Sequence, residues 1–314
     1  MSGAFGRPGT LTHIVEVTEI VMAANKPVKL LWSREDDIRH GVCWPASLMK
    51  IKASLDAEDN IDAWQAKRVD GNITPETLKN MLPGLFPGLA EDYNFPHCSV
   101  HHVTVDHGVP LTLWRSVGHS FTAFAKETIM DELALAADMD VVDFRLQNST
   151  ANPRLNNVIK VAGEKMRQMQ PAAGHHLGFA AHSSFLTDVA QIAEVSIADG
   201  VIKVHKVTCV LDCVLDCGIA VNPDVVRGQV EGAIMFGLTA ALHGDRELAA
   251  GAFKESNFHD YQILRMNEAP AVDVVIIASQ DAPRVSANPA CRLWHQRWLM
   301  RCLRRRGNAC APCH

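Results

Sequence analysis

The sequence predicts an α+β fold, in which mixed sheets that contain β-hairpins pack against separate helices. Two observations point to this class. Residues 47–69 and 190–212 alternate between apolar and polar side chains with a period of two, and each run is interrupted by a polar turn. Residues 122–139 and 222–244 instead carry apolar side chains at the spacing of a helix.

The first elements alternate between helix, strand and loop. We expect a helix over residues 12–24, because an apolar run with two glutamates ends there before Asn25. Residues 28–32 (VKLLW) are expected to form a short buried strand, and residues 33–41 (SREDDIRHG) a charged loop. The period-two pattern of residues 47–69 then predicts a hairpin with a polar tip.

The middle of the chain is less regular. Residues 74–96 are rich in proline and glycine, which predicts an irregular segment, and residues 98–108 alternate as a strand. The helix over 122–139 follows, with its apolar side chains near one face. A polar stretch at 148–157 is expected to mark the boundary between two domains.

The last elements have clear end signals. The hairpin at 190–212 has Asp199-Gly200 at its turn, a pair that favours a tight hairpin connection. The helix at 222–244 has Asn222 as its N-cap and Gly244 as its C-cap. The apolar run at 271–279 (AVDVVIIAS) predicts a late buried strand.

Composition limits the class of protein. The chain has 314 residues, of which 47% are apolar and 21% charged, so it is globular and long enough for about two domains. Its net charge is −5, and seven arginines lie at residues 284–314, so the rest carries −12. That acidic body argues against a nucleic-acid partner. No apolar run approaches the roughly 18 residues of a membrane span.

Several reactive side chains lack the spacing of a known site. The sequence VLDC occurs twice in tandem at 210–217, which we interpret as a short duplication, although cysteines four residues apart leave a metal site as an alternative. Ser183 and Ser184 have no nucleophile-elbow pattern. The remaining candidates are histidines without metal-ligand spacing, which we interpret as structural: His40, His101, His102, His119 and His259.

Six segments, in order, resemble the molybdopterin-binding subunit of the xanthine dehydrogenase/aldehyde oxidase family, in particular the beta subunits of the isoquinoline 1-oxidoreductase type. The segments are SGAFGRPG, VKLLWSREDDIRHG, WRSVGHS, DELA, DCGIAVNPDVVRGQVEGAIMFGL and SNFHDYQILRM. They extend from Ser2 to about Asp281. The resemblance implies that residues 1–150 are the C-terminal part of a first molybdopterin-binding domain and residues 151–283 a second such domain.

The resemblance also implies a molybdenum–molybdopterin cofactor of the cytosine dinucleotide type. Small residues in SGAFGRPG let the backbone approach a ligand, and an arginine and a glutamine supply donors for an anionic group. The residues that match the cofactor-binding positions of the family are Gly3, Phe5, Gly6, Arg115, Ser116, Gly118 and Gln229.

The family's reaction is the hydroxylation of an N-heterocycle or an aldehyde, with water as the oxygen source. The resemblance implies an iron–sulfur (2Fe-2S) small subunit as partner, to which electrons leave. It also implies a general-base glutamate in a GVGEPG segment near the C-terminus. Relatives that carry export signals are periplasmic, whereas this sequence shows no such signal, so we expect a cytoplasmic location.

The chain departs from the family pattern at both ends. It begins at the glycine-rich loop, so we expect N-terminal cofactor segments to be absent. After Arg284 the expected GVGEPG is replaced by a basic, cysteine-rich tail (284–314), expected to be disordered. Back-translation in a shifted frame permits V-G-E-P-G over residues 285–290, with the glutamate lost across Ala287 and Asn288. We therefore expect a frameshift, no retained catalytic residue and no activity of the chain alone.

An alternative function lies in the same tail. Cys302, Cys310, Cys313 and His314 could hold zinc, and the arginines could bind nucleic acid. The tail has only one C-x-x-C pair and otherwise irregular spacing, which is weak support for a zinc site.

Overall fold

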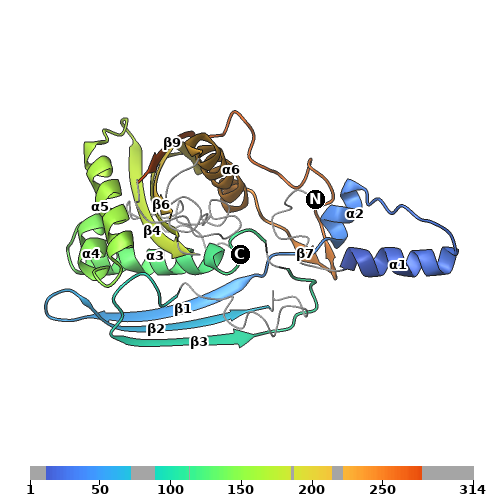
Figure 1. Cartoon of the computed structure of the whole chain (residues 1–314), viewed down its shortest axis with the longest axis horizontal. Helices are drawn as coiled ribbons and strands as arrows, with labels where there is room; N and C mark the ends of the chain where they lie inside the picture. The colour runs from blue at the N-terminus through green and yellow to red at the C-terminus, as the bar shows by residue number, and fades with distance from the viewer. Residues whose placement is uncertain (1–11, 72–88, 113, 185–186, 214–221, 278–314) are drawn as a thin grey trace.

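The structure is a computed structural model, which describes residues 12–71, 89–112, 114–184, 187–213 and 222–277. Within these ranges the chain forms six helices and nine strands. The strands make three sheets, and helices pack on them (Figure 1). The predicted α+β class is confirmed. The predicted features of the glycine-rich loop, of the second VLDC copy and of the tail lie outside the described residues.

Two predictions for the first segment are wrong. Helix α1 (Thr12–Ala24) forms as expected, with no buried residue, but residues 28–32 are not a strand, and Leu31 is 84% exposed. Helix α2 (Arg34–His40) replaces the predicted charged loop. The Ser33 hydroxyl accepts the Asp36 amide while the Asp36 carboxylate accepts the Ser33 amide, a reciprocal cap that starts the helix.

The first sheet contains the predicted hairpin. Strands β1 (Ser47–Leu55) and β2 (Ile61–Asp70) pair antiparallel, and β3 (His97–Thr104) pairs parallel to β2. The sheet order is β1-β2-β3, below helix α3 in Figure 1. Trp64 on β2 is almost fully buried and belongs to the main hydrophobic core.

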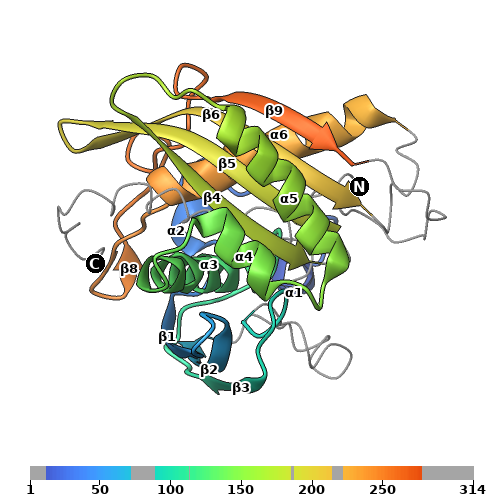
Figure 2. The same cartoon turned by 90° about the vertical axis from the view of Figure 1, so that its left-hand side faces the viewer.

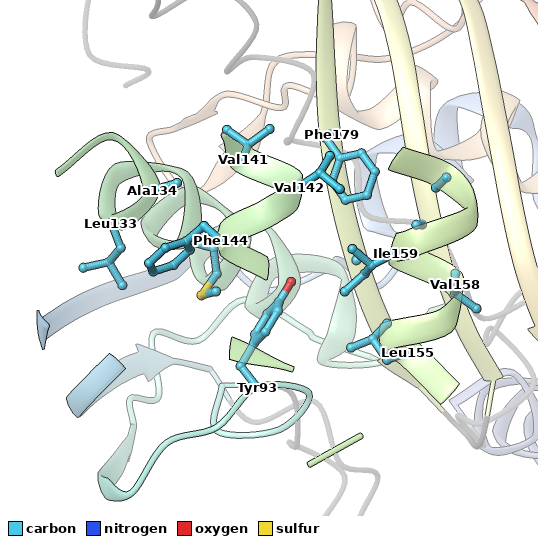
Figure 3. Close-up of a cluster of buried hydrophobic side chains, with 14 of the residues drawn as sticks. Tyr93, Leu133, Ala134, Val141, Val142, Phe144, Leu155, Val158, Ile159 and Phe179 are labelled. Atoms are coloured by element: carbon cyan, nitrogen blue, oxygen red, sulfur yellow. The ribbon is translucent and has the colours of Figure 1, made fainter. Parts of the chain in front are cut away.

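Three helices follow, of which only the first is predicted. Helix α3 (His119–Ala136) starts slightly earlier than expected, and the polar stretch at 148–157 contains the end of α4 (Val141–Asn148) and the start of α5 (Pro153–Gln168). The Asn148 side chain is buried and accepts the Ile61 amide at 2.8 Å. One apolar cluster includes residues from Ile61 to Val210, among them those in Figure 3, so both sides of residue 150 share a core. The boundary itself stays a prediction.

The second sheet has the order β4-β5-β6-β9. The predicted hairpin is β5 (Thr187–Ala198) and β6 (Val201–Cys213), and its turn residues Asp199 and Gly200 have φ angles of 52° and 77°. Positive φ at both turn residues is the conformation that an Asp-Gly pair favours. The predicted strand at 271–279 is β9 (Ala271–Ile276), parallel to β6, and β4 (His175–Ser184) was not expected.

Both faces of this sheet are covered, which explains the continuous apolar character of its central strands. On β5, Ala190 and Ile192 belong to the core that α5 shares, and Val189 and Val195 to the core of α6 (Pro223–Leu242). Figure 2 shows α5 and α6 across the sheet from one another. Asn222 caps α6 as predicted, but the C-cap is His243, not Gly244. A small hairpin, β7 (Leu248–Ala249) and β8 (Ala252–Phe253), follows.

Candidate functional site

The segment that precedes α3 has an unusual backbone. Ser116 and Val117 both lie in the left-handed region, with φ angles of 72° and 49°. For residues with a side chain this conformation costs about 1–3 kcal/mol each, so the surrounding contacts must hold it. The Ser116 hydroxyl donates to the Arg115 carbonyl at 2.5 Å, and the His119 amide donates to the Ser116 carbonyl at 3.1 Å. We call residues 115–118 the arginine loop.

The arginine loop meets helix α6. The Arg115 side chain is largely buried, at 8% exposure, and its guanidinium donates to the Gln229 carbonyl at 3.5 Å. The same guanidinium lies 5.8 Å from the centre of the Phe236 ring, within reach of a cation–π contact. Two segments that are 114 residues apart in sequence therefore share one site.

The donor set of this site fits an anionic, hydrogen-bonding cofactor. The Arg115 guanidinium is a donor, and Gln229 on the exposed face of α6 adds a side-chain amide. Beside Gln229, a Cβ atom added at Gly228 or Gly232 would meet no atom within 4 Å. The face of α6 next to the arginine therefore has room for a ligand to approach the backbone.

Aromatic side chains surround the arginine loop. The rings of Trp44 and Trp114 stack with centroids 4.9 Å apart, and Phe121 lies 5.6 Å from Trp44. Phe236 of α6 meets Trp114 edge-on at 5.1 Å. These ring contacts join the segment before β1, the arginine loop and α6 into one apolar surface. This packing restrains the strained backbone of the arginine loop.

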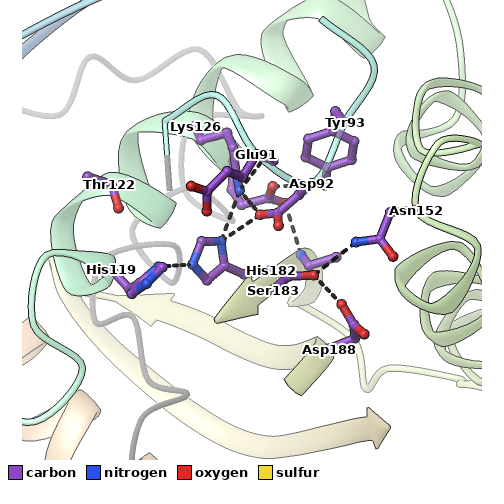
Figure 4. Close-up of polar contacts among 12 residues, drawn as sticks. Glu91, Asp92, Tyr93, His119, Thr122, Lys126, Asn152, His182, Ser183 and Asp188 are labelled. Atoms are coloured by element: carbon purple, nitrogen blue, oxygen red, sulfur yellow. Dashed lines mark hydrogen bonds and ion pairs between the residues drawn. The ribbon is translucent and has the colours of Figure 1, made fainter. Parts of the chain in front are cut away.

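A buried polar cluster lies behind the loop, between α3, β4 and residues 91–93 (Figure 4). The His119 Nδ1 atom lies 2.8 Å from His182 Nε2. The other ring nitrogen of His182, Nδ1, lies 2.9 Å from both the Asp92 carboxylate and the Lys126 ammonium group. Asp92 and Lys126 form a direct ion pair.

The charges of this cluster are set by burial and by one another. Burial alone would raise the pKa of Asp92, but the positive charge of Lys126, together with His182, outweighs it and holds that pKa far below its usual range. Burial and the neighbouring Lys126 lower the pKa of His182. At neutral pH the Asp92 carboxylate is therefore ionised and the His182 ring is neutral.

A second buried ion cluster anchors α3 to α4 and β4. The Arg145 guanidinium contacts Glu127 at 2.9 Å and Asp131 at 2.7 Å. Glu127 also accepts the Tyr93 hydroxyl at 2.8 Å and the Ala181 amide at 2.9 Å. These contacts join α3 to α4, to β4 and to Tyr93, and so hold the fold together. We therefore interpret this cluster as structural.

Ser183 has a structural partner as well. Its hydroxyl donates to the Asp188 carboxylate and accepts the Asn152 side-chain amide at 3.2 Å. Asn152 is also the N-cap of α5, so this contact fixes the start of that helix against β4.

Comparison with known proteins identifies the family. Residues 1–149 and 122–270 match two family models, each described as a molybdopterin cofactor-binding domain. The beta subunit of isoquinoline 1-oxidoreductase from Brevundimonas diminuta is 30% identical over 301 residues, which cover 90% of this chain and 37% of that protein. The chain belongs to the molybdopterin-binding subunits of the xanthine dehydrogenase/aldehyde oxidase family.

A second relative is less similar to this chain. A nicotinate dehydrogenase subunit from Pseudomonas putida is 27% identical, over 90% of this chain and 26% of that protein. The chain thus spans well under half the length of these two relatives. Among solved structures, the aldehyde oxidoreductase from Desulfovibrio gigas has a TM-score of 0.76 at 15% identity, over 95% of this chain and 51% of that one.

Quinoline 2-oxidoreductase from Pseudomonas putida 86 superposes with a TM-score of 0.73 at 12% identity, over 92% of this chain and 61% of that one. At such identities the likeness shows the shared fold. No helix among the described residues is long and apolar enough to cross a bilayer.

The structure brings together part of the predicted cofactor set. Arg115, Ser116 and Gly118 form the arginine loop, and Gln229 lies on the helix that this loop contacts. Gly3, Phe5 and Gly6 lie outside the described residues. The cofactor-binding role of all seven residues stays a prediction.

Sequence reasoning missed the polar cluster behind the loop. From the sequence, His119 is interpreted as a structural residue and no partner is assigned to it. Asp92 and Lys126 belong to no recognised motif. The only sequence signal is the position of His119, directly after the arginine loop. The zinc or nucleic-acid alternative rests on residues 284–314, outside the described ranges, and the comparisons lend it no support.

Proposed function

We propose that the chain forms part of a molybdenum hydroxylase, an oxidoreductase that hydroxylates an N-heterocycle or an aldehyde with water as the oxygen source. The observation that carries the proposal is the contact between Arg115 and the Gln229 carbonyl. It joins two predicted cofactor-binding segments within a chain whose residues 1–270 match molybdopterin-binding models.

The chain's own residues would bind and orient the cofactor. Arg115 would neutralise negative charge, since a largely buried guanidinium forms strong, directional bonds to anionic oxygens. Gln229 would supply a donor from α6, and Gly3, Phe5 and Gly6 would complete the cofactor-binding set. When bound, the molybdopterin supplies two-electron redox chemistry, while the protein supplies orientation. We propose the cytosine dinucleotide form of the cofactor.

The substrate and the partner follow from the relatives. Isoquinoline and nicotinate, in the names of the two sequence relatives, are N-heteroaromatic compounds, which favours an N-heterocycle over an aldehyde. Two of these relatives are named as subunits, which supports a multi-subunit enzyme. We propose a 2Fe-2S small subunit as the partner that accepts the electrons.

We also propose that the chain alone is inactive, because its reading frame changes after Arg284. Support comes from the back-translation, which restores V-G-E-P-G over residues 285–290 in the shifted frame. The coding DNA tests this directly. A shifted-frame translation after Arg284 that lacks a glycine-glutamate-proline-glycine run would refute the frameshift and leave the cofactor proposal intact.

Cofactor content tests the proposed function. The chain is expressed in a host that makes the cytosine dinucleotide cofactor, and the purified protein is analysed for molybdenum and for released cytidine monophosphate. We expect both in the wild type, and a loss of about tenfold in Arg115→Ala, since supporting side chains at metal sites contribute about 10–100-fold in affinity.

The matched control is Arg167→Ala, because Arg167 is half exposed and pairs with Asp143 at 2.5 Å on the far helices. This variant should keep the wild-type cofactor content. A wild-type chain without molybdenum, or an Arg115→Ala variant with the same content as Arg167→Ala, would contradict the proposal.

A further inference from the structure

A continuous row of buried polar side chains leads from the arginine loop into the core. It begins at His119, the first residue of α3, whose amide bonds the loop carbonyl of Ser116. It continues through His182 of β4 to Asp92, by ring contacts of 2.8 and 2.9 Å (Figure 4). Lys126, further along α3, is the last member of the row and forms an ion pair with Asp92.

Stability does not explain this row. The side chains of Lys126 and Asp92 are almost completely buried. A buried ion pair is often no more stable than apolar side chains of the same volume, because removing both charges from water offsets their attraction. Asp92 has, in addition, a φ of 87°, a left-handed conformation that costs an aspartate about 1–3 kcal/mol. A strained residue that holds a costly charge indicates a role in positioning.

The tautomer of His182 sets the direction of the hydrogen bonds along the row. The Asp92 carboxylate accepts from the Lys126 ammonium group, and His182 Nδ1 lies 2.9 Å from both groups, where it can donate to Asp92 or accept from Lys126. The tautomer that we assign to His182 carries the proton on Nδ1 and donates it to Asp92. The Nε2 atom of that neutral ring then carries a lone pair, which accepts the Nδ1–H group of His119 at 2.8 Å. Asp92 thereby fixes the tautomer and the ring orientation of His119, the first residue of α3.

We propose that Asp92, Lys126 and His182 are positioning residues, which hold His119 and so keep the arginine loop in the backbone conformation that presents Arg115 to the cofactor. The inference rests on the proposed function for its ligand. Two consecutive left-handed residues, Ser116 and Val117, make the loop dependent on such a restraint. The relay acts from behind, through His119, and does not touch the cofactor face of α6.

The two nitrogens of His182 can be tested one at a time. The amide of His182→Gln reaches the position of Nε2 and can still accept from His119, whereas the amide of His182→Asn reaches only the position of Nδ1, near Asp92. We expect His182→Asn to lose about tenfold in molybdenum and cytidine monophosphate content. His182→Gln should lose less than His182→Asn, because it keeps the contact to His119 and loses only the contact to Asp92. Equal contents in both variants would overturn the relay.

A control separates positioning from lost stability. Asn156→Ala removes partly buried hydrogen bonds to Leu146 and Ser149, remote from the loop, at 2.8 and 2.9 Å. The thermal unfolding midpoint of each variant is measured beside its cofactor content. Asn156→Ala should lower the midpoint without lowering the cofactor content. If cofactor content follows the midpoint in all three variants, the row is merely structural.

A second readout is independent of the cofactor. In the full chain with ¹⁵N-labelled histidine, nitrogen chemical shifts report the tautomer of each ring, assigned by the variants. We expect the Nδ1–H tautomer at His182 and a proton on Nδ1 of His119, and a change at His119 in Asp92→Asn. An Nε2–H tautomer at His119 would overturn the relay. If the wild type holds no molybdenum while the tautomers are as expected, the proposed function fails and the relay stands.

Discussion

His182 shows how one buried side chain couples folding to pH. Its pKa is lowered by burial and by Lys126, with Asp92 and Glu127 acting in the opposite direction. A histidine with a folded pKa below its unfolded value of about 6.5 resists protonation only in the folded state. Its contribution to stability is therefore present above about pH 6.5 and is lost as the pH falls below that value.

The first prediction follows at this scale. The free energy of unfolding, measured by urea titration, should fall more between pH 7 and pH 5 in the wild type than in His182→Gln. His205, whose pKa is also lowered by burial and by His175, contributes equally to both proteins and cancels in the difference. Parallel pH profiles for the two proteins would show that His182 is not held neutral by its surroundings.

Site residues differ in how far the sequence could predict them. Arg115 and Gln229 are found only because their segments resemble a family, since neither stands in a motif with its own spacing rule. Asp92, Lys126 and His182 could not be found, because they are 34 to 90 residues apart and meet only when β4 packs on α3. Burial creates their chemistry, and burial of a polar residue has no local signature.

Elements were predicted where local pattern and tertiary packing agree. The two hairpins and helices α3 and α6 have either an uninterrupted pattern of apolar residues or a clear capping residue. Each of these features can be read from the sequence. Residues 28–32 are mostly apolar but none is buried, because no neighbouring strand pairs with them among the described residues. Helix α2 was missed although Ser33 and Asp36 have capping-box spacing, and α5 was missed although Asn152-Pro153 is a helix start.

The second prediction concerns the packing of α4 on α5. A Cβ atom at Gly163 would lie 2.4 Å from Cγ1 of Val142, so the two helices approach too closely for alanine. Gly163→Ala should destabilise the chain by about 1–3 kcal/mol, the usual cost of overpacking. This sign is opposite to that of helix propensity, which favours alanine over glycine by about 1 kcal/mol.

The control is Gly232→Ala on α6, where an added Cβ meets nothing within 4 Å and should not destabilise the chain. Denaturant unfolding of both variants and of Gly163→Ala/Val142→Ala measures the contact. The double variant should be less destabilised than the sum of its single variants, because removing the valine methyl groups makes room for the alanine. Additive losses would mean that the clash is relieved by a movement of the helices.

At the scale of the whole molecule, the second sheet is the feature that assembles the site. Helices α5 and α6 cover its opposite faces, and α3 lies between it and the first sheet (Figure 2). The arginine loop at the start of α3 therefore meets α6 only when both cores have formed. A ligand that contacts the loop and α6 together should stabilise the folded chain as a whole, since it binds the folded state alone.

The last prediction compares chains with and without cofactor. At a ligand concentration of 100 times the dissociation constant, binding adds about 2.7 kcal/mol, so the loaded wild type should unfold at a clearly higher temperature than the cofactor-free chain. Arg115→Ala should lose most of this increment. Its cofactor-free midpoint should change less than its cofactor-bound midpoint, because only the loaded chain also loses the contact between the guanidinium and the cofactor. Scanning calorimetry on both forms of both proteins measures the four midpoints, and an increment unchanged by Arg115→Ala would place the cofactor away from the arginine loop.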